Sequence, residues 1–406
     1  MSCSSPSPDP SHSPIRPPHP EEYTARLLLV GGGHAHLEVL RRLHLQPASG
    51  LQLTVVSALR HHHYSGMIPG YLRGTYTEEM IRVDLPPLVR AAAGRFLVGR
   101  AIDLDVSRCR LTLDDGRVLP YDLISLGVGS LPEGSQEVDV QEHASVIKPL
   151  SRTVRLRRSL LELAARGRSG SPGQPQDLVV VGGGAAGVEM ALAMAGLLDE
   201  AGCPRHLAIL EAGGTLLAGY SVRFRRRAEG ILAARGIQVR RRAPVEQVAA
   251  RHLTLQGGER VSSHLTVWLA GARGQPFLAR TGLPVDSRGF LLVDRSLRSI
   301  SDRRVFAAGD CATLRDHPRT PKAGVYAVRQ GPVLWASLMA AIRRQEPPRY
   351  HPQDSFLSIL STGDGKALLR YKALISHSRW AWWLKDRIDR RFMGHYTNLC
   401  AAGSGA

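Results

Sequence analysis

The sequence predicts an α/β protein in which a unit of strand, glycine-rich turn, helix and strand occurs twice. The first unit spans residues 25–56 and the second spans residues 178–210. A unit of this kind forces its two strands to lie parallel, with a right-handed crossover through the helix. Its repetition after roughly half of the ordered chain indicates two domains, each built on its own parallel sheet.

Length and charge limit the functions that need to be considered. The 406 residues are enough for two or three domains. The formal net charge is +18, so the chain carries a solvated basic surface or meets an anionic membrane or substrate. These alternatives stay open. No zinc finger or RNP-like motif occurs, and nucleic acid is therefore not expected as a partner.

Cysteine usage and the N-terminal residues bear on location. The five cysteines are far apart and form no CxxC pair, which is typical of a reducing compartment. No apolar run reaches the ~18 residues that a transmembrane helix needs. Residues 1–24 are rich in Ser, Pro and His without an apolar core, which predicts a disordered tail. We expect a cytoplasmic protein, and a peripheral position on the inner face of a membrane stays open.

The first glycine turn follows the apolar strand Ala25–Val30 and opens a helix at His34. Gly31 permits the tight turn, and Gly33 lets the backbone approach a pyrophosphate at the positive end of the helix. His36 replaces the third glycine of the usual pattern. The acidic residue that usually closes the second strand is also missing, because Ser57 stands near that place.

The second glycine turn is the more specific signal. Gly182, Gly184 and Gly187 have the full GxGxxG spacing directly after a strand. Glu211 ends the next strand, where a carboxylate accepts hydrogen bonds from a ribose hydroxyl and repels a 2′-phosphate. This favours NADH over NADPH, although Arg205 before the same strand leaves NADPH open.

The remaining segments complete the expected organisation. A hairpin is predicted around the Asp-Gly step of residues 114–116, and a connector rich in Gly, Ser and Pro spans residues 167–177. A strand at 304–307 leads into Gly309 and Asp310, and a long helix covers 324–342. The expected domains are 25–150 and 285–345 for a first domain in two halves, 176–275 for an inserted second domain, and 350–406 for a small C-terminal segment.

Four motifs in this order resemble the pyridine nucleotide–disulfide oxidoreductase superfamily of flavoproteins. They are LLLVGGGHAH, LISLGVGSLP, VVVGGGAAGVEMA and VFAAGDCA, within about residues 25–345. Further stretches resemble the type II NADH:quinone dehydrogenase branch, and more closely the dehydrogenase-like module fused to selenide, water dikinase. These stretches are YSGMIPGYL, PKAGVYAVRQGP and WLKDRIDRRFM. The resemblance implies two Rossmann-like domains, an FAD domain split by an NAD(P)H domain, with the small C-terminal segment after them.

The resemblance also implies a role for each motif. The first turn would lie along the FAD pyrophosphate, Asp310 would bind the ribityl chain, and the helix opening at residues 322–325 would stabilise anionic reduced flavin. Gly127 and Gly129 would lie where the chain crosses between the domains. The residues implied for FAD are Gly31, Gly33, His36, Gly127, Gly129, Gly309, Asp310 and Val325, and those implied for the nicotinamide dinucleotide are Gly182, Gly184, Gly187, Glu189 and Glu211.

Two departures from the superfamily matter for the chemistry. Disulfide reductases and sulfide:quinone reductases need paired cysteines, whereas only Cys311 lies near a flavin motif, so it is interpreted as a small buried residue. The glutamine-rich quinone signature of type II dehydrogenases is also degraded and leaves Gln330. The electron acceptor therefore stays open.

Other side chains bear on catalysis, metal binding and partner contact. Lys322 and Tyr64 are the candidates for contacts on the flavin side, where Lys322 could stabilise negative charge. The run His61–His63 cannot direct all its rings at one ion, so no metal site is predicted and a structural role is favoured. The segment 378–396 mixes Trp with Lys and Arg, as in an interfacial membrane helix or in a basic helix packed on the protein body.

The expected function is an FAD-dependent NAD(P)H dehydrogenase that reduces a quinone-like small acceptor. A soluble flavin reductase linked to selenium or sulfur metabolism, and a flavin-binding redox sensor with little turnover, stay open as alternatives. A homodimer and a peripheral membrane contact also stay open.

Overall fold

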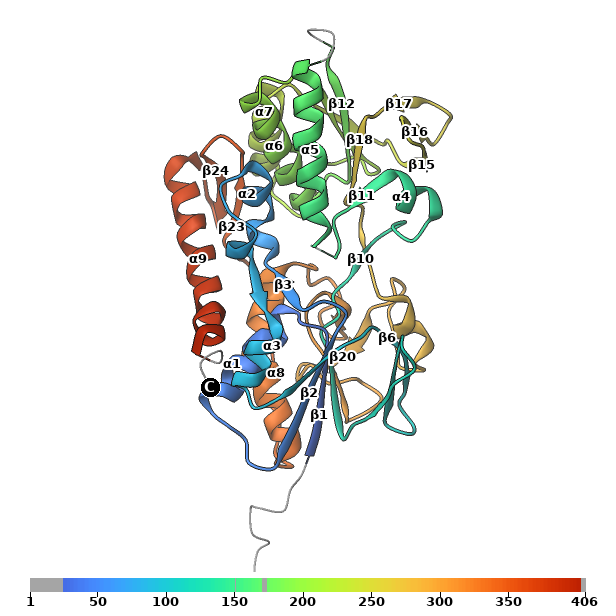
Figure 1. Ribbon diagram of the computed structural model, residues 1–406, viewed down its shortest axis with the longest axis vertical. Coiled ribbons are helices and arrows are strands. Elements are labelled where there is room, and N and C mark those ends of the chain that lie inside the picture. Colours follow the sequence, from blue (N-terminus) through green and yellow to red (C-terminus); the bar gives the residue numbers. More distant parts are fainter. Residues whose placement is uncertain (1–24, 150, 170–173, 403–406) are drawn as a thin grey trace, which may run out of the picture.

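The protein consists of two α/β domains stacked end to end, with a long C-terminal helix along one side (Figure 1). The structure is a computed structural model that describes residues 25–149, 151–169 and 174–402. The tail expected at residues 1–24 lies outside the described residues. In Figure 1 the first domain is below and the second above.

The first domain is built on a five-stranded parallel sheet in the order β21-β9-β1-β2-β5. Its central strand ends in the continuous apolar run Leu-Leu-Leu-Val, because both faces of the sheet are buried there. The helix after β1 packs against the long helix α8. The elements are β1 (Ala25–Val30), α1 (His34–Leu45), β2 (Leu51–Ser57), β5 (Arg95–Val98), β9 (Leu123–Leu126), β21 (Val305–Ala307) and α8 (Gly324–Ile342).

Smaller elements surround this sheet. Strands β6, β7 and β8 form an antiparallel sheet, and the predicted Asp-Gly hairpin joins β7 to β8 with Gly116 at φ +84°. The elements are β3 (His61–His63), η1 (Ser65–Met67), α2 (Ile68–Arg73), η2 (Glu79–Ile81), β4 (Arg82–Asp84), α3 (Leu85–Ala91), β6 (Ala101–Asp105), β7 (Arg110–Leu113), β8 (Val118–Pro120), η3 (Pro276–Arg280), β20 (Leu291–Val293), η4 (Gly309–Cys311) and β22 (Ala312–Leu314).

The second domain has its own five-stranded parallel sheet in the order β11-β18-β12-β13-β14. An antiparallel sheet of β15, β16 and β17 lies beside it. The elements are α4 (Val138–His143), β11 (Ala144–Val146), α5 (Arg152–Ser169), β12 (Gln176–Val181), α6 (Ala185–Glu200), β13 (Arg205–Glu211), α7 (Val222–Ala234), β14 (Ile237–Arg241), β15 (Val245–Val248), β16 (His252–Leu255), β17 (Arg260–Ser262) and β18 (Leu265–Trp268).

Sheet pairing moves one expected boundary. Residues up to 150 were expected in the first domain, but β11 pairs with β18 of the second sheet. Helix α5 then runs to Ser169, into the stretch expected as a connector. The domain change occurs earlier, where β10 (Leu131–Pro132) pairs antiparallel with β19 (Ala272–Arg273). These two strands are the outgoing and returning crossings between the domains.

The C-terminal segment is a three-stranded antiparallel sheet followed by helix α9. Its elements are β23 (Ser358–Ser361), β24 (Ala367–Tyr371), β25 (Leu374–Ser378) and α9 (Arg379–Ala402). Helix α9 contacts α3 and β4 of the first domain, and β23 contacts α6 of the second. The segment therefore touches both domains. Among the described residues, no helix is long and apolar enough to span a membrane.

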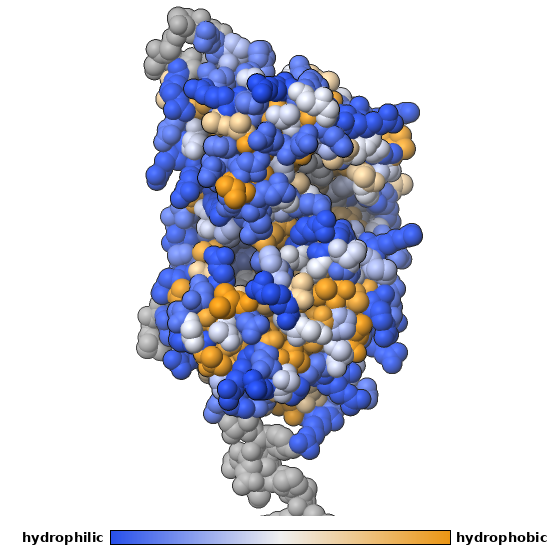
Figure 2. Space-filling view, turned by 90° about the vertical axis from the view of Figure 1, so that its right-hand side faces the viewer, coloured by the Kyte–Doolittle hydropathy of each residue, from blue (hydrophilic) through white to orange (hydrophobic). Residues whose placement is uncertain are grey.

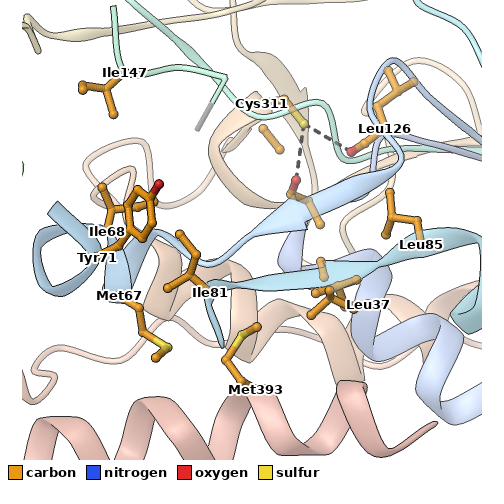
Figure 3. Close-up of a cluster of buried hydrophobic side chains, with 14 of the residues drawn as sticks. Leu37, Met67, Ile68, Tyr71, Ile81, Leu85, Leu126, Ile147, Cys311 and Met393 are labelled. Carbon is orange, nitrogen blue, oxygen red and sulfur yellow. Dashed lines mark hydrogen bonds between the residues drawn. The ribbon is translucent and has the colours of Figure 1, made fainter. Parts of the chain in front are cut away.

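The two faces of α9 bear on whether this segment is an interfacial membrane helix or a basic helix packed on the protein body. Met393 and Tyr396 are buried against the body, and Figure 3 shows Met393 beside Met67 and Ile81 of the first domain. Trp380 and Trp383 are about half exposed, at 54% and 51%. The helix does pack on the protein body, but these two Trp side chains lie on its outward face.

Exposed apolar side chains also occur on the face away from α9. Figure 2 shows that hydrophilic side chains cover most of the upper domain on this face, and that hydrophobic ones gather on the lower domain. The exposed residues Val98, Ile102 and Val118 belong to β5, β6 and β8 of that domain.

Candidate active site

The first glycine turn is fixed by a close backbone crossing. Gly31 has φ +92°, and a Cβ added to it would lie 2.5 Å from the carbonyl oxygen of Gly127 at the end of β9. A Cβ on Gly33 would lie 2.7 Å from the same oxygen. Only glycine fits both positions, because any side chain would push β9 away from the turn. The crossing leaves the N-terminus of α1 uncovered by side chains of the turn itself.

His36 is a structural residue. Its ring is fully buried, with Nδ1 2.6 Å from the Gly31 carbonyl oxygen and Nε2 2.8 Å from Ser125 Oγ. Burial lowers the pKa of His36 to about 4, so the ring is neutral. A carbonyl can only accept, so Nδ1 donates to Gly31 and Nε2 accepts from the Ser125 hydroxyl. Both ring nitrogens are therefore used inside the protein, and the implied place of His36 along the FAD pyrophosphate stays a prediction.

The second glycine turn repeats the arrangement. Gly182 has φ +113°, and a Cβ on it would lie 2.4 Å from the Leu269 carbonyl oxygen. A Cβ on Gly187 would lie 1.9 Å from the Gly182 carbonyl oxygen, so only glycine lets α6 pack this closely. Gly184 differs, since nothing lies within 4 Å of its Cβ position. Its backbone faces open space, where a ligand can approach.

Glu211 is held beside this turn. Its carboxylate accepts the N–H of Gly183 at 2.8 Å and the N–H of Gly213 at 2.7 Å. A carboxylate has about four acceptor positions, so two remain for ribose hydroxyl groups. Arg205 lies at the other end of β13 and pairs with Asp199. The expectation that Arg205 leaves room for a 2′-phosphate is therefore wrong, because six residue steps of a strand are roughly 20 Å.

Asp310 lies in the turn after β21, at one end of the first sheet. Its carboxylate accepts the Lys148 ammonium at 3.0 Å and the Ser130 hydroxyl at 3.2 Å. Burial alone would raise the pKa of Asp310, but Lys148 and Ser130 hold it below its usual value. The turn is fixed by Gln330, whose Oε1 accepts the Gly309 N–H at 2.6 Å. Asp310 is thus an ionised acceptor that lines a narrow cavity.

Three residues of this arrangement were missed in the sequence. Lys148, Ser130 and the structural role of Gln330 have no local signal, because their partners lie 162, 180 and 21 residues away along the chain. Ser130 does stand in the motif LISLGVGSLP. Gly129 beside it has φ +68° and open space at its Cβ position.

Lys322 lies at the start of α8, in the wall of the same cavity. Its ammonium donates to Thr313 Oγ1 at 2.8 Å and to the Ala312 carbonyl, and it lies 4.1 Å above the ring of Phe290. Burial lowers the pKa of Lys322 to about 8. Val325 is half-buried in the first turn of the helix. A catalytic role for Lys322 stays a prediction, with the ammonium already held by these protein partners.

Three rings form an aromatic wall that consists of His34, Tyr64 and Phe392. The ring centroids of Tyr64 and Phe392 are 4.6 Å apart, and those of His34 and Tyr64 are 5.6 Å apart. The Tyr64 hydroxyl donates to Asp389 Oδ1 at 3.0 Å, and burial with this carboxylate raises the pKa of Tyr64. The wall therefore joins the first glycine turn to α9.

Glu189 does not face the dinucleotide turn that precedes it. Its Oε1 accepts the N–H of Ser361 in β23 at 2.7 Å. Burial raises the pKa of Glu189 to about 7, although the charge of Lys385 acts in the opposite direction. Lys385 itself donates to Gly66 O at 2.6 Å and Asp389 Oδ2 at 2.8 Å. Glu189, expected to hold the dinucleotide, thus lies under the C-terminal segment.

The histidine run and Cys311 have structural surroundings. His61–His63 form strand β3, in which His61 Nε2 lies 3.1 Å from Asp84 and the ring of His62 packs on His34 at 4.6 Å. Within the described ranges, no three His, Cys, Asp or Glu side chains come together as a metal site. Cys311 is fully buried, and its thiol donates toward Leu126 O at 3.2 Å (Figure 3). The interpretation of Cys311 as a small buried residue is confirmed.

Two glycine turns, each opening a helix at the end of a parallel sheet, and a half-buried aspartate beside the first define a two-domain dinucleotide-binding oxidoreductase. The model of the pyridine nucleotide-disulphide oxidoreductase family matches residues 25–331, and the chain belongs to this family. The expected α/β fold is confirmed, and so is the expected place of the chain in a pyridine nucleotide-disulphide oxidoreductase family.

Relatives of known name agree with this assignment. The chain is 26% identical over 310 residues to a demethylphylloquinone reductase of Synechocystis. The matched region covers 72% of this chain and 74% of that protein. The chain is 27% identical over 221 residues to a probable NADH dehydrogenase of Dictyostelium discoideum, which covers 51% of this chain and only about half, 49%, of that protein. Among solved structures, NDH2 of Plasmodium falciparum in complex with NADH has a TM-score of 0.79 at 14% identity, with 94% and 97% of the two chains covered.

Proposed function

We propose that the protein passes electrons from NADH through FAD to a quinone-like acceptor. The observation that supports this most is the combination of two glycine turns that accept no side chain with the ionised Asp310 beside the first. The relatives add support for the acceptor, since one is named a demethylphylloquinone reductase. The chain spans about three quarters of that relative.

The residues at the first turn fit FAD. Gly33 at the N-cap of α1 makes no side-chain cap hydrogen bond, which suits a pyrophosphate there, and Gly129 has open space at its Cβ position. Asp310 is a half-buried acceptor for ribityl hydroxyl groups, kept ionised by Lys148. His34 carries a buried Nε2 atom with no hydrogen-bond partner in the part of the chain that the structure describes. A polar ligand between these groups supplies what they lack.

When bound, FAD supplies the two-electron chemistry that no side chain of the chain provides. Asp310 orients the cofactor, and the N-terminus of α8 at Lys322–Val325 stabilises negative charge at the flavin pyrimidine ring. Gly182, Gly184 and Gly187 hold the NADH pyrophosphate at the N-terminus of α6. Glu211 accepts from the adenosine ribose and repels a 2′-phosphate, which gives NADH preference over NADPH.

The quinone-like acceptor approaches from the side of the aromatic wall and α9. Burial raises the pKa of Glu189 to about 7, so this side chain can hold a proton there at neutral pH. The positive charge of the nearby Lys385 ammonium, whose pKa is raised, stabilises a negative charge on the acceptor. The outward face of α9 carries Trp380 and Trp383, with the Arg387 guanidinium 5.6 Å from the Trp383 ring. Such a face fits peripheral contact with an anionic bilayer, from which a quinone would enter.

Anaerobic spectroscopy tests this function. The purified protein should show the absorbance of oxidised flavin, lose it on addition of NADH, and recover it on addition of a short-chain quinone. The variant Asp310→Ala should lose the flavin, whereas Asp316→Ala, an exposed aspartate nearby in sequence, should keep it. A colourless wild-type protein, or a bleached protein that no quinone reoxidises, would contradict the proposal.

Sedimentation with vesicles tests the membrane contact. The protein should bind vesicles that contain anionic lipid, and Trp380→Ser with Trp383→Ser should weaken this binding while the flavin spectrum stays unchanged. Equal binding of the variant and the parent would assign the charge excess, and not the Trp face, to the contact.

A further inference from the structure

His34 is a half-buried titratable side chain with an inaccessible Nε2 atom, and the proposed chemistry has not used it. It is the first residue of α1, directly after the glycine turn. A Cβ placed on Gly324, the first residue of α8, would lie 3.8 Å from its Nε2 atom. The imidazole therefore stands between the starts of the two helices that are proposed to bind the pyrophosphate and the pyrimidine ring of FAD.

The Nε2 atom of His34 lacks a protein partner. It is inaccessible to solvent, and no residue among those described donates to it or accepts from it. A buried polar atom without a partner costs stability. Its counterpart in His36, two residues on, is satisfied by Ser125. The Nε2 atoms of His62 and His63 in β3 also lack partners among the described residues, but His34 stands between the starts of α1 and α8, so a group that binds between these helices can pair with it.

The surroundings keep the His34 ring neutral. Burial is the largest cause of a pKa of about 4, the positive charge of Lys148 acts in the same direction, and Asp310 opposes both. His62 of β3 packs edge-on against the ring, Tyr64 faces it from the position between β3 and η1, and α9 contributes the uncharged Phe392. In this environment the imidazole can gain a proton only if a new negative charge appears next to it.

We propose that His34 takes up a proton when the flavin is reduced and gives it to the acceptor when the flavin is reoxidised. This inference rests on the proposed function. NADH delivers a hydride, which is two electrons and one proton, so the flavin gains one negative charge. One proton from water then binds His34 Nε2. When the flavin returns the hydride to a quinone, His34 returns its proton, and the sum is NADH, H⁺ and quinone converted to NAD⁺ and quinol.

The size of the effect is sufficient. A unit charge about 4 Å away, at an effective dielectric constant of about 20, changes proton affinity roughly a thousandfold, or about 3 on the pKa scale. Starting from a pKa of about 4, such a change brings His34 to protonation near neutral pH. The position of His34 in the aromatic wall places that proton on the side where the acceptor approaches.

Proton counting tests the inference on the holoenzyme. The flavin is reduced anaerobically with one equivalent of NADH in a weakly buffered solution that contains a pH indicator. Hydride transfer by itself consumes no proton from solution, so uptake approaching one proton per flavin reports protonation of either the reduced flavin or a protein group, and the comparison of variants assigns it. This uptake should disappear in His34→Gln and persist in His62→Gln, which changes the neighbouring buried ring.

A second measurement uses wild-type protein alone and so does not depend on flavin binding by the variants. In wild-type protein the pH slope of the flavin midpoint potential should correspond to two protons per two electrons below neutral pH, twice the slope expected for hydride addition alone. Bleaching by NADH without proton uptake, in wild-type protein, would overturn the role of His34 and leave the proposed function intact. Uptake that persists in His34→Gln would place the proton elsewhere. Failure of NADH to bleach the flavin would instead contradict the proposed function.

Discussion

Acidification should destabilise the fold through His36, and the structure gives the magnitude. The His36 ring is fully buried with both nitrogens bonded, and its pKa in the folded protein is about 4 against an ordinary value of 6.5. The unfolded chain therefore binds more protons between these values. The contribution of the neutral His36 ring to the free energy of unfolding is complete above about pH 6.5 and is lost as the pH falls toward about 4. The difference corresponds to about 3 kcal/mol in total, of which about 2 kcal/mol is lost by about pH 5.

The variant His36→Asn isolates this contribution. Its amide nitrogen can still donate to Gly31 O, but the Ser125 hydroxyl loses its acceptor, so we expect about 1–3 kcal/mol lower stability near pH 7. Between about pH 7 and 5 the variant should lose about 2 kcal/mol less than the parent. Urea unfolding across this range measures both quantities, and His44→Asn, at a partly exposed position on the same helix, serves as the control.

One result would refute this reasoning. If His36→Asn and the parent lose stability in parallel as the pH falls, the ring is protonated without cost in the folded state. The neutral tautomer that donates to Gly31 and accepts from Ser125 would then be wrong.

Three further predictions concern the second glycine turn and a cysteine. Gly187→Ala should lower stability and NADH affinity together, because its Cβ would lie 1.9 Å from the Gly182 carbonyl oxygen. Gly184→Ala should keep the melting temperature and lose only NADH affinity, because its Cβ position is empty in the protein. Calorimetry and NADH titration separate the two effects. Glu211→Ser should raise the ratio of NADPH to NADH turnover at least tenfold, since a change of one charge contact is worth about 1.4 kcal/mol or more, and an unchanged ratio in steady-state kinetics would remove Glu211 from specificity. Cys311 should resist iodoacetamide in the native protein and react after denaturation, because it is fully buried and burial raises the pKa of its thiol; labelling in the native state, detected by mass spectrometry, would contradict this.

The sequence predicted the parts of the fold that depend on local pattern. Both glycine turns, the strands before them and the helices after them lie where spacing placed them, since a strand that feeds a helix through glycine has few other arrangements. The boundary at 150 was wrong for a non-local reason. Strand β11 has three residues, and its membership in the second sheet is decided by pairing with β18, more than a hundred residues later.

The candidate site was predicted less completely than the fold. Glycines are recognisable because their lack of a side chain has a steric cause that works within a few residues. The ionisation of Asp310 depends on Lys148 from the second domain's first segment, which no spacing indicates. His36 was assigned to the ligand because it stands where a glycine is usual, yet the same position lets its ring fill the space between β1 and β9.

The C-terminal sheet affects how the two domains can move. Besides the paired crossings β10 and β19, the C-terminal segment also links the two domains. Its Ser361 donates to Glu189 of the second domain, and its Gly363 carbonyl accepts from Arg73 of the first domain. A body attached at one hinge can swing, but a body attached at two separated places cannot rotate unless one attachment breaks. Rotation of the second domain against the first is therefore expected to require that one of these connections breaks, and the two glycine turns keep their spacing while the connections hold.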